Sequence, residues 1–261
     1  MPEDRDAVSS VVPPGFRLAV SNLESLTWPD GGRSERAVGV NGHEVLAVVL
    51  QVRNDALCVL AWQRTLPPHD GAWALPGGAL RPDETLEQSV RRHLADKVDV
   101  RELSFLEQLT TVSDPGRHPD TRLLGTAYLG LVPSDADPAL PPDTRWHPAT
   151  RTPPMAFDHR ALAVSGCERL RAKLSYTNIG FALAPSVFTI AELTSIYAAA
   201  LGYEVSPTNL RRIMLHRQLL EATGQSATSG RAGGRPAARF RFRAATYQVT
   251  DQFAVLRPPR D

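Results

Sequence analysis

The stretch Trp73–Val100, WALPGGALRPDETLEQSVRRHLADKVDV, constrains the fold more than any other part of the 261-residue chain. A turn is predicted at Pro76–Gly78, because glycine adopts backbone angles that other residues avoid. The run Pro82–Glu84 is typical of the first turn of a helix, where proline and acidic side chains are favoured. One apolar helix face is then predicted by the four-residue spacing of Leu86, Val90 and Leu94. The stretch therefore predicts a strand end, a glycine turn, a short loop and a helix.

Length and composition limit the number of domains and the kind of protein that this chain can be. The chain has room for one large domain or two small ones, and 42% hydrophobic residues are ordinary for a protein with a buried core. No apolar run approaches the roughly 18 residues of a membrane span, and the acidic start MPEDRDAVSS does not have the pattern of a signal peptide. Cys58 and Cys167 lie far apart, so neither a metal cluster nor a disulfide framework is predicted. We therefore expect a cytoplasmic protein without membrane contact.

Charge is distributed unevenly along the chain. Ten arginines and three acidic residues follow position 204, a net charge of +7, whereas the other 19 basic and 25 acidic residues leave −6. A basic end on an acidic body is typical of a protein that meets a polyanion there. The alternative is that this sequence simply prefers arginine, since lysine occurs only at positions 97 and 173.

Apolar and polar segments alternate through the first two thirds of the chain. Residues 1–40 are rich in Pro, Gly, Ser and charge and predict a loosely packed arm. Strands are predicted at Glu44–Val52, Ala56–Trp62, Leu103–Val112 and Leu123–Val132. Between them we expect a hairpin at Arg53–Asp55, a polar loop at 113–121, a surface segment with seven prolines at 133–154, and a closing helix at Asp158–Leu174. These elements predict an α+β or α/β sandwich.

The last third predicts two helices joined by a short turn. Thr189 and Glu192 fit a capping box, and Gly202 is typical of a helix C-terminus. Ser206, followed by proline, predicts the start of the next helix, which completes a helix-turn-helix pattern. The exposed residues near the start of that helix are expected to be Thr208, Asn209, Arg211, Arg212 and His216.

A predicted β-hairpin follows the two helices. Arginine and phenylalanine alternate over residues 239–243, as in a strand with one buried face, and the glycine-rich tip before it carries Arg231 and Arg235. A helix-turn-helix with such a hairpin is a winged helix. Recognition helices read base edges with Asn and Arg, while wing arginines neutralise phosphates. The alternative is a helix pair that serves as a scaffold with a solvated charged face.

The opening stretch resembles the Nudix box, in which helix glutamates hold Mg²⁺ or Mn²⁺ for cleavage of a diphosphate. The matching residues are Gly78, Glu84, Arg92, Leu94 and Val100. At the family's three helix carboxylates this chain has His93, Asp96 and Lys97, and Asp99 replaces a glycine. Hard cations require oxygen ligands, so lysine and histidine remove most of such a site. We expect no catalytic residue, no bound metal and no hydrolysis, with Glu84 and Arg92 forming a structural ion pair.

A box that does not cleave can still bind a nucleotide. The loop SDPGRHPDT at 113–121 resembles the Gly/Asp/Pro loop of ADP-ribose-type Nudix domains. The candidate ligand-binding residues are Arg64, Trp73, Gly78, Arg81, Asp114 and Arg122. Trp73 is alternatively a core residue, and each arginine is alternatively a solvated surface residue.

The order of the two predicted domains along the chain indicates one protein family more specifically than either domain does alone. A Nudix-like domain followed by a winged helix resembles the Nudix-related transcriptional regulators, the NrtR family, from about Glu44 to Phe242. The runs that carry the resemblance are WALPGG (73–78), AFDH (156–159), RLRAKLSYT (169–177), FALAP (181–185), TNLRR (208–212) and GGRPAARFRF (233–242). The resemblance implies an α+β protein, with a Nudix-like α/β/α sandwich at 41–180 and a C-terminal winged helix-turn-helix domain at 185–261.

The same resemblance implies a function. It implies a homodimeric repressor of NAD-metabolism genes that binds a double-stranded DNA operator, with ADP-ribose or a related nucleotide as effector and no required cofactor. The implied DNA-binding residues are Thr208, Asn209, Arg211, Arg212, Arg231 and Arg235. Two alternatives remain: an active ADP-ribose hydrolase with a DNA-binding tail, and a sensor whose basic domain binds protein.

Overall fold

A mixed β-sheet forms the centre of the first domain. The structure is a computed structural model that describes residues 42–227 and 236–251, all within one compact unit. Seven strands of this described part form one sheet. They are β1 (Gly42–Arg53), β2 (Ala56–Gln63), β3 (Trp73–Ala74), β4 (Gly77–Ala79), β5 (Phe105–Val112), β6 (Leu123–Leu131) and β7 (Thr144–Pro148). The order is β3-β2-β1-β6-β5, with β4 paired to β1 and β7 to β2, and only the pair β1–β6 is parallel among these strands.

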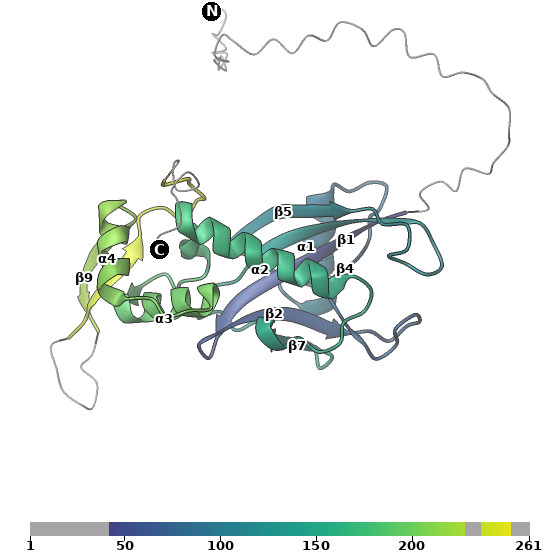
Figure 1. Cartoon of the computed structure of the whole chain (residues 1–261), viewed down its shortest axis with the longest axis horizontal. Coiled ribbons are helices and arrows are strands. Elements are labelled where there is room, and N and C mark those ends of the chain that lie inside the picture. Colours follow the sequence, from purple (N-terminus) through teal and green to yellow (C-terminus); the bar gives the residue numbers. More distant parts are fainter. Residues whose placement is uncertain (1–41, 228–235, 252–261) are drawn as a thin grey trace, which may run out of the picture. The chain divides into compact units, whose positions relative to one another are not determined.

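The two faces of the sheet are covered by helices α1 (Leu86–Val98) and α2 (His159–Tyr176). Alternate residues of β1 point to opposite faces, and the strand is apolar on both. Val45, Ala47 and Val49 belong to the hydrophobic cluster that contains α1. Leu46, Val48 and Leu50 belong to the cluster that contains α2, which crosses the front of the sheet in Figure 1. The α/β/α sandwich expected from the sequence is confirmed.

The hairpin between β1 and β2 forms at the predicted position. Asn54 and Asp55 both have positive φ angles, 48° and 58°, and Arg53 pairs with Ala56. Two central residues with positive φ define the type I′ turn, whose twist matches that of the strands.

Helix α1 begins later than the sequence predicted. Thr85 is its N-cap, and Gln88 completes a capping box with it, so Pro82–Glu84 precede the helix instead of forming its first turn. This expectation was wrong because the hydroxyl of Thr85 accepts the N–H of Gln88, which fixes the first turn there. The helix ends at Asp99 with a φ of 51°, a left-handed conformation that aspartate tolerates better than most residues.

Two further segments differ from the sequence prediction. Gly77 and Gly78 form strand β4, where a turn was expected. Glycine is needed at 77 because a Cβ there would lie 2.2 Å from the carbonyl oxygen of Val45 on β1. The proline-rich segment contains β7 and a 3-10 helix at Ala149–Arg151, neither of which was predicted. Proline has no backbone N–H to donate to a neighbouring strand, so a proline-rich segment is not predicted to contain even a short edge strand.

The last part of the described chain is a winged helix. Its elements, preceded by a 3-10 helix at Ile179–Ala182, are β8 (Phe188–Thr189), α3 (Ile190–Leu201), α4 (Pro207–His216), β9 (Leu220–Ser226) and β10 (Ala238–Phe242). The predicted capping box of Thr189 and Glu192 is present, and Gly202 ends α3 with a φ of 82°. Ser206 caps α4, which confirms the helix-turn-helix. No helix in the described part of the chain is both long and apolar enough to cross a membrane.

Candidate functional site

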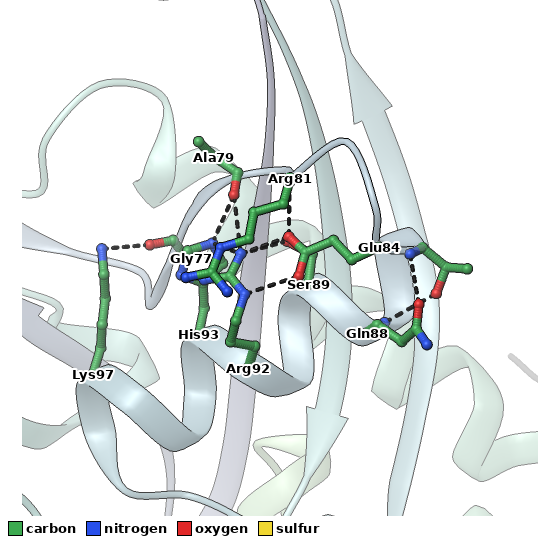
Figure 2. Close-up of polar contacts among 10 residues, drawn as sticks. Gly77, Ala79, Arg81, Glu84, Gln88, Ser89, Arg92, His93 and Lys97 are labelled. Atoms are coloured by element: carbon green, nitrogen blue, oxygen red, sulfur yellow. Dashed lines mark hydrogen bonds and ion pairs between the residues drawn. The ribbon is translucent and has the colours of Figure 1, made fainter.

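Glu84 and Arg92 form an ion pair beside helix α1. Arg92 donates from Nε and Nη2 to the two carboxylate oxygens of Glu84, at 2.8 and 2.5 Å (Figure 2). The N–H of Arg81 also donates to Glu84, at 2.8 Å. The hydrogen bond from Arg92 is the main reason why the pKa of Glu84 lies well below its usual value. The structural ion pair expected from the sequence is confirmed.

His93 occupies the first of the three helix positions at which the Nudix box has a carboxylate. Its imidazole is buried, and Nε2 lies 3.1 Å from the carbonyl oxygen of Ala79. A Cβ at Gly78 would lie 2.7 Å from Cε1 of His93, so the glycine at 78 allows this close packing. Burial lowers the pKa of His93, and the ring is therefore held in its neutral form at pH 7.

Lys97 occupies the third of these positions. Its ammonium donates a 2.6 Å hydrogen bond to the carbonyl oxygen of Gly77 and lies 4.6 Å from the centroid of the Trp62 ring. Burial lowers the pKa of Lys97, and the neighbouring positive charge of Arg64 lowers it further. Figure 2 shows Arg92, His93 and Lys97 extending from α1 toward the segment Gly77–Ala79.

These side chains do not fit a hard divalent cation. Such an ion requires several oxygen ligands, and Asp96 supplies the one carboxylate among the three positions. The carboxylate of Glu84 is already held by Arg92 and by the Arg81 N–H. Within residues 42–227 and 236–251, no group of three His, Cys, Asp or Glu side chains is arranged to hold a metal ion.

A cavity of about 820 Å³ lies between the loop at 113–121 and the start of α2. Its lining includes His69, Asp114, Arg117, Met155, Phe157 and Asp158. The loop precedes β6, whereas Met155, Phe157 and Asp158 directly precede α2, so the two sides of the cavity come from separate parts of the sequence. The cavity is therefore a product of the tertiary fold.

Arg117 forms the charged wall of this cavity. Its side chain is only 2% exposed and donates to Glu44 at 2.5 Å and to Asp158 at 3.0 Å. A Cβ at Gly125 would lie 2.8 Å from Arg117 Nη2, so this glycine makes room for the guanidinium. Burial alone would lower the pKa of Arg117, but the hydrogen bonds with Asp158 and Glu44 outweigh it and raise the pKa.

Phe157 supplies an aromatic surface beside the charged wall. Its ring is stacked on His118 with centroids 5.1 Å apart, and His69 meets it edge-on at 4.8 Å. The guanidinium carbon of Arg64 lies 5.0 Å from the centroid of the same ring. The residue has a φ of 52°, an uncommon conformation for a bulky side chain that tends to occur at functional sites.

Three of the ligand-binding residues predicted from the sequence lie at or near this cavity. Asp114 lines it, and Arg64 packs on Phe157, which also lines it. Trp73 forms a β-bridge with the cavity residue Met155 and meets His147 edge-on at 4.3 Å. Trp73 thus has packing contacts that also fit the alternative of a core residue.

The other three predicted residues lie elsewhere. Gly78 packs on His93, and Arg81 is exposed with its backbone N–H bound to Glu84. Arg122 donates to the carbonyl oxygen of Ser113 at 2.5 Å and so closes the loop that carries Asp114. None of these three is among the residues that line the described cavity.

Helix α4 presents a polar surface to solvent. Thr208, Asn209, Arg211 and Arg212 are all exposed, whereas Leu210 and Met214 are buried behind them. Arg212 donates to the side-chain oxygen of Asn209 at 2.9 Å. The predicted wing residues Arg231 and Arg235 lie outside the residues that the structure describes.

Comparison with known proteins identifies the family. A model of the NUDIX domain matches residues 42–163, and a model of the NrtR DNA-binding winged helix domain matches residues 180–242. The ADPR-responsive transcriptional repressor NtrR of Acinetobacter baylyi is 30% identical over 201 residues, which cover 74% of this chain and 79% of that protein. The chain belongs to the NrtR family. The resemblance inferred from the sequence is confirmed.

Solved structures of the NrtR family have the same two-domain fold. The crystal structure of Shewanella oneidensis NrtR complexed with a 27mer DNA is 33% identical, with a TM-score of 0.66 over 77% of this chain and 93% of that one. A second crystal structure of Shewanella oneidensis NrtR is 32% identical, with a TM-score of 0.68 over 77% of this chain and 94% of that one. The likeness spans the sandwich and the winged helix together.

The residues that build the wall and the aromatic surface of the cavity, Arg117 and Phe157, were not among the predicted ligand-binding residues. Arg117 was hidden in the middle of a polar loop, where surface solvation is the ordinary expectation. Phe157 and Asp158 stand in the AFDH run, which was among the stretches that carried the resemblance to the NrtR family. That run was the available signal, but nothing in its composition indicated a pairing with Arg117.

Proposed function

We propose that the chain is a DNA-binding transcriptional repressor whose Nudix domain senses ADP-ribose or a related nucleotide. The observation that carries this proposal is the presence, in one chain, of an exposed polar helix in a winged helix and a Nudix helix without its metal ligands. The Acinetobacter relative, named an ADPR-responsive repressor, supports both halves. Genes of NAD metabolism are the proposed targets.

The proposed DNA contacts are made by α4 and the wing. Thr208, Asn209, Arg211 and Arg212 would enter the major groove, and Arg231 and Arg235 would contact phosphates. The exposure of the four helix residues supports this assignment. Because winged-helix regulators commonly bind two half-sites, a homodimer on a double-stranded operator is part of the proposal.

The proposed effector site lies in the Nudix domain. Asp114, Arg64 and Trp73 lie at or near the cavity, and we add Arg117 and Phe157 as residues that shape it. Gly78, Arg81 and Arg122 would support the neighbouring segments. No cofactor is required in this proposal. To release or strengthen DNA binding, the nucleotide must bind one arrangement of the protein more tightly than another.

We also propose that the chain does not hydrolyse ADP-ribose. His93 and Lys97 stand at two metal positions, and the carboxylate of Glu84 is engaged by Arg92. The competing proposal is an active hydrolase with a DNA-binding tail. Incubation of the full chain with ADP-ribose and Mg²⁺, followed by chromatography for AMP, separates the two. Steady release of AMP would refute the sensor proposal.

A mobility-shift assay tests the DNA-binding half. The probe is duplex DNA from the region upstream of the chain's own gene, and ADP-ribose is titrated into the complex. We expect a specific complex whose amount changes with ADP-ribose and falls steeply with salt, because arginine–phosphate contacts release counterions. Absence of a DNA complex, together with capture of a protein partner by the basic domain, would support the third alternative instead.

A further inference from the structure

The charges around Gly77–Ala79 are not balanced by the described ion pairs. Glu84 pairs with Arg92, while Glu44 and Asp158 both pair with Arg117. Lys97 and Arg64 have no carboxylate partner among the ion pairs of the described residues. Both donate only to backbone carbonyl oxygens, Lys97 to Gly77 and Arg64 to Pro68 and Leu66.

This arrangement has a cost in the free protein. Lys97 is partly buried, and burial of an ammonium is unfavourable unless an anion compensates it. The Lys97 ammonium lies over the ring of Trp62, only two residues before Arg64 in the chain. The positive charge of Arg64 lowers the pKa of Lys97 by more than the charge of Glu44, which is paired with Arg117, raises it. An apolar side chain of the same length would pack on Trp62 without either penalty. The position of Lys97 therefore points to a bound anion.

We propose that Lys97 and Arg64 hold the diphosphate of the effector in the place of a divalent metal, so that ADP-ribose binds without Mg²⁺. This inference rests on the proposed function and specifies how the site recognises its ligand. A diphosphate diester carries two negative charges near pH 7, which two fixed cations can match. Lysine acts as a point charge on phosphate, and arginine offers a planar set of donors.

The geometry gives Lys97 a defined orientation. The carbonyl oxygen of Gly77 accepts one of the three ammonium N–H donors at 2.6 Å, and the Trp62 ring packs against the same group at 4.6 Å. Arg64 is held by the carbonyl oxygens of its own loop and by the Phe157 ring. Because both side chains are already positioned, little conformational entropy is lost when the anion binds.

Isothermal titration calorimetry of the full chain with ADP-ribose tests the proposal. We expect the same affinity in EDTA and in excess Mg²⁺. Lys97→Met, which keeps an apolar chain over Trp62, should weaken binding about tenfold or more, as for loss of a charged hydrogen bond. Lys97→Glu should weaken it further, and Lys97→Arg should retain most of it. The matched control is Arg91→Gln, since Arg91 is exposed on the same helix and pairs with Glu87.

Two additional measurements make the result specific. Thermal melting of each variant establishes that it is folded, and inorganic pyrophosphate should compete with ADP-ribose for the wild type in EDTA but not for Lys97→Met. Binding that requires Mg²⁺, or wild-type affinity in Lys97→Met, would overturn the inference and leave the proposed sensor intact. Failure of ADP-ribose to bind with or without Mg²⁺ would instead overturn the proposed function, and the inference with it.

Discussion

Arg117 donates two hydrogen bonds, each 3.0 Å long, to the carboxylate of Asp158, the residue that directly precedes helix α2. The pair joins the loop at 113–121 to the start of a helix that covers one face of the sheet. Glu44 of β1 binds the same guanidinium. One buried cation thus connects three segments that are separate in the sequence.

Replacement of Arg117 by alanine should strongly destabilise the Nudix domain. We expect a loss of about 3–5 kcal/mol in the free energy of unfolding, because the carboxylates of Glu44 and Asp158 lose their buried partner. Urea denaturation followed by circular dichroism measures the change. Arg117→Lys should recover only part of the loss, since an ammonium does not reproduce the two-pronged contact. A loss below about 1 kcal/mol would contradict a structural role for the buried pair.

His159 should make the protein less stable in mild acid. Burial lowers the pKa of His159 to about 4, compared with the ordinary value of 6.5. Below pH 6.5 the unfolded chain binds a proton that the folded protein excludes, so stability falls as the pH drops from about 6.5 to about 4. The loss from this residue is on the order of 3 kcal/mol. Urea unfolding at pH 7, 6, 5 and 4 measures it.

A matched variant isolates this contribution. Nδ1 of His159 accepts the N–H of Leu75 at 3.0 Å, and glutamine in its place can still offer an acceptor but does not titrate. His159→Gln should therefore show a shallower decrease of stability between pH 6.5 and 4. Burial also lowers the pKa of His93 and of His147, so some pH dependence will remain. An unchanged slope in the variant would argue that His159 is accessible to protons in the folded state.

Alanine at Asn209 or Arg212 should weaken binding to a specific operator. Each substitution should reduce the free energy of operator binding by about 1–3 kcal/mol if the side chain forms hydrogen bonds with a base edge. Because Arg212 donates to Asn209, the two effects should not add, and the double variant should lose less than the sum. Fluorescence anisotropy on labelled duplexes measures the affinities. Arg101→Ala, an exposed arginine of the Nudix domain, is the control, and equal losses there would point to a general charge effect.

Removal of the Phe157 ring should weaken the proposed nucleotide binding. The ring is already in contact with Arg64, His69 and His118, which leaves an ordered aromatic surface at the cavity. We expect about a tenfold or greater loss of ADP-ribose affinity in Phe157→Ala, the usual scale for a stacking contact with a base. Leu66→Ala, at an apolar side chain 68% exposed in a neighbouring loop, should bind normally. Unchanged ADP-ribose affinity in Phe157→Ala would show that the adenine base does not stack on this ring.

Much of the local structure follows from short sequence signals. Asn54 and Asp55 adopt the hairpin turn, and Thr189, Gly202 and Ser206 cap the helices of the winged helix as predicted. Such signals act through hydrogen bonds between residues two to four positions apart, so the sequence contains all of the interacting partners. The error at α1 was also local, because the prediction used Pro82–Glu84 as the first turn and did not use Thr85 as the cap.

The candidate site was decided by contacts between distant segments. Arg117 lies 73 residues from Glu44 and 41 residues from Asp158, and no local pattern indicates that a charged loop residue will be buried. The sequence by itself determined that a Nudix-like domain is followed by a winged helix. It also determined that His93 and Lys97 replace metal-binding carboxylates. Only the tertiary structure decided which cations of the described residues are paired with carboxylates, because folding determines which partners surround a buried charge.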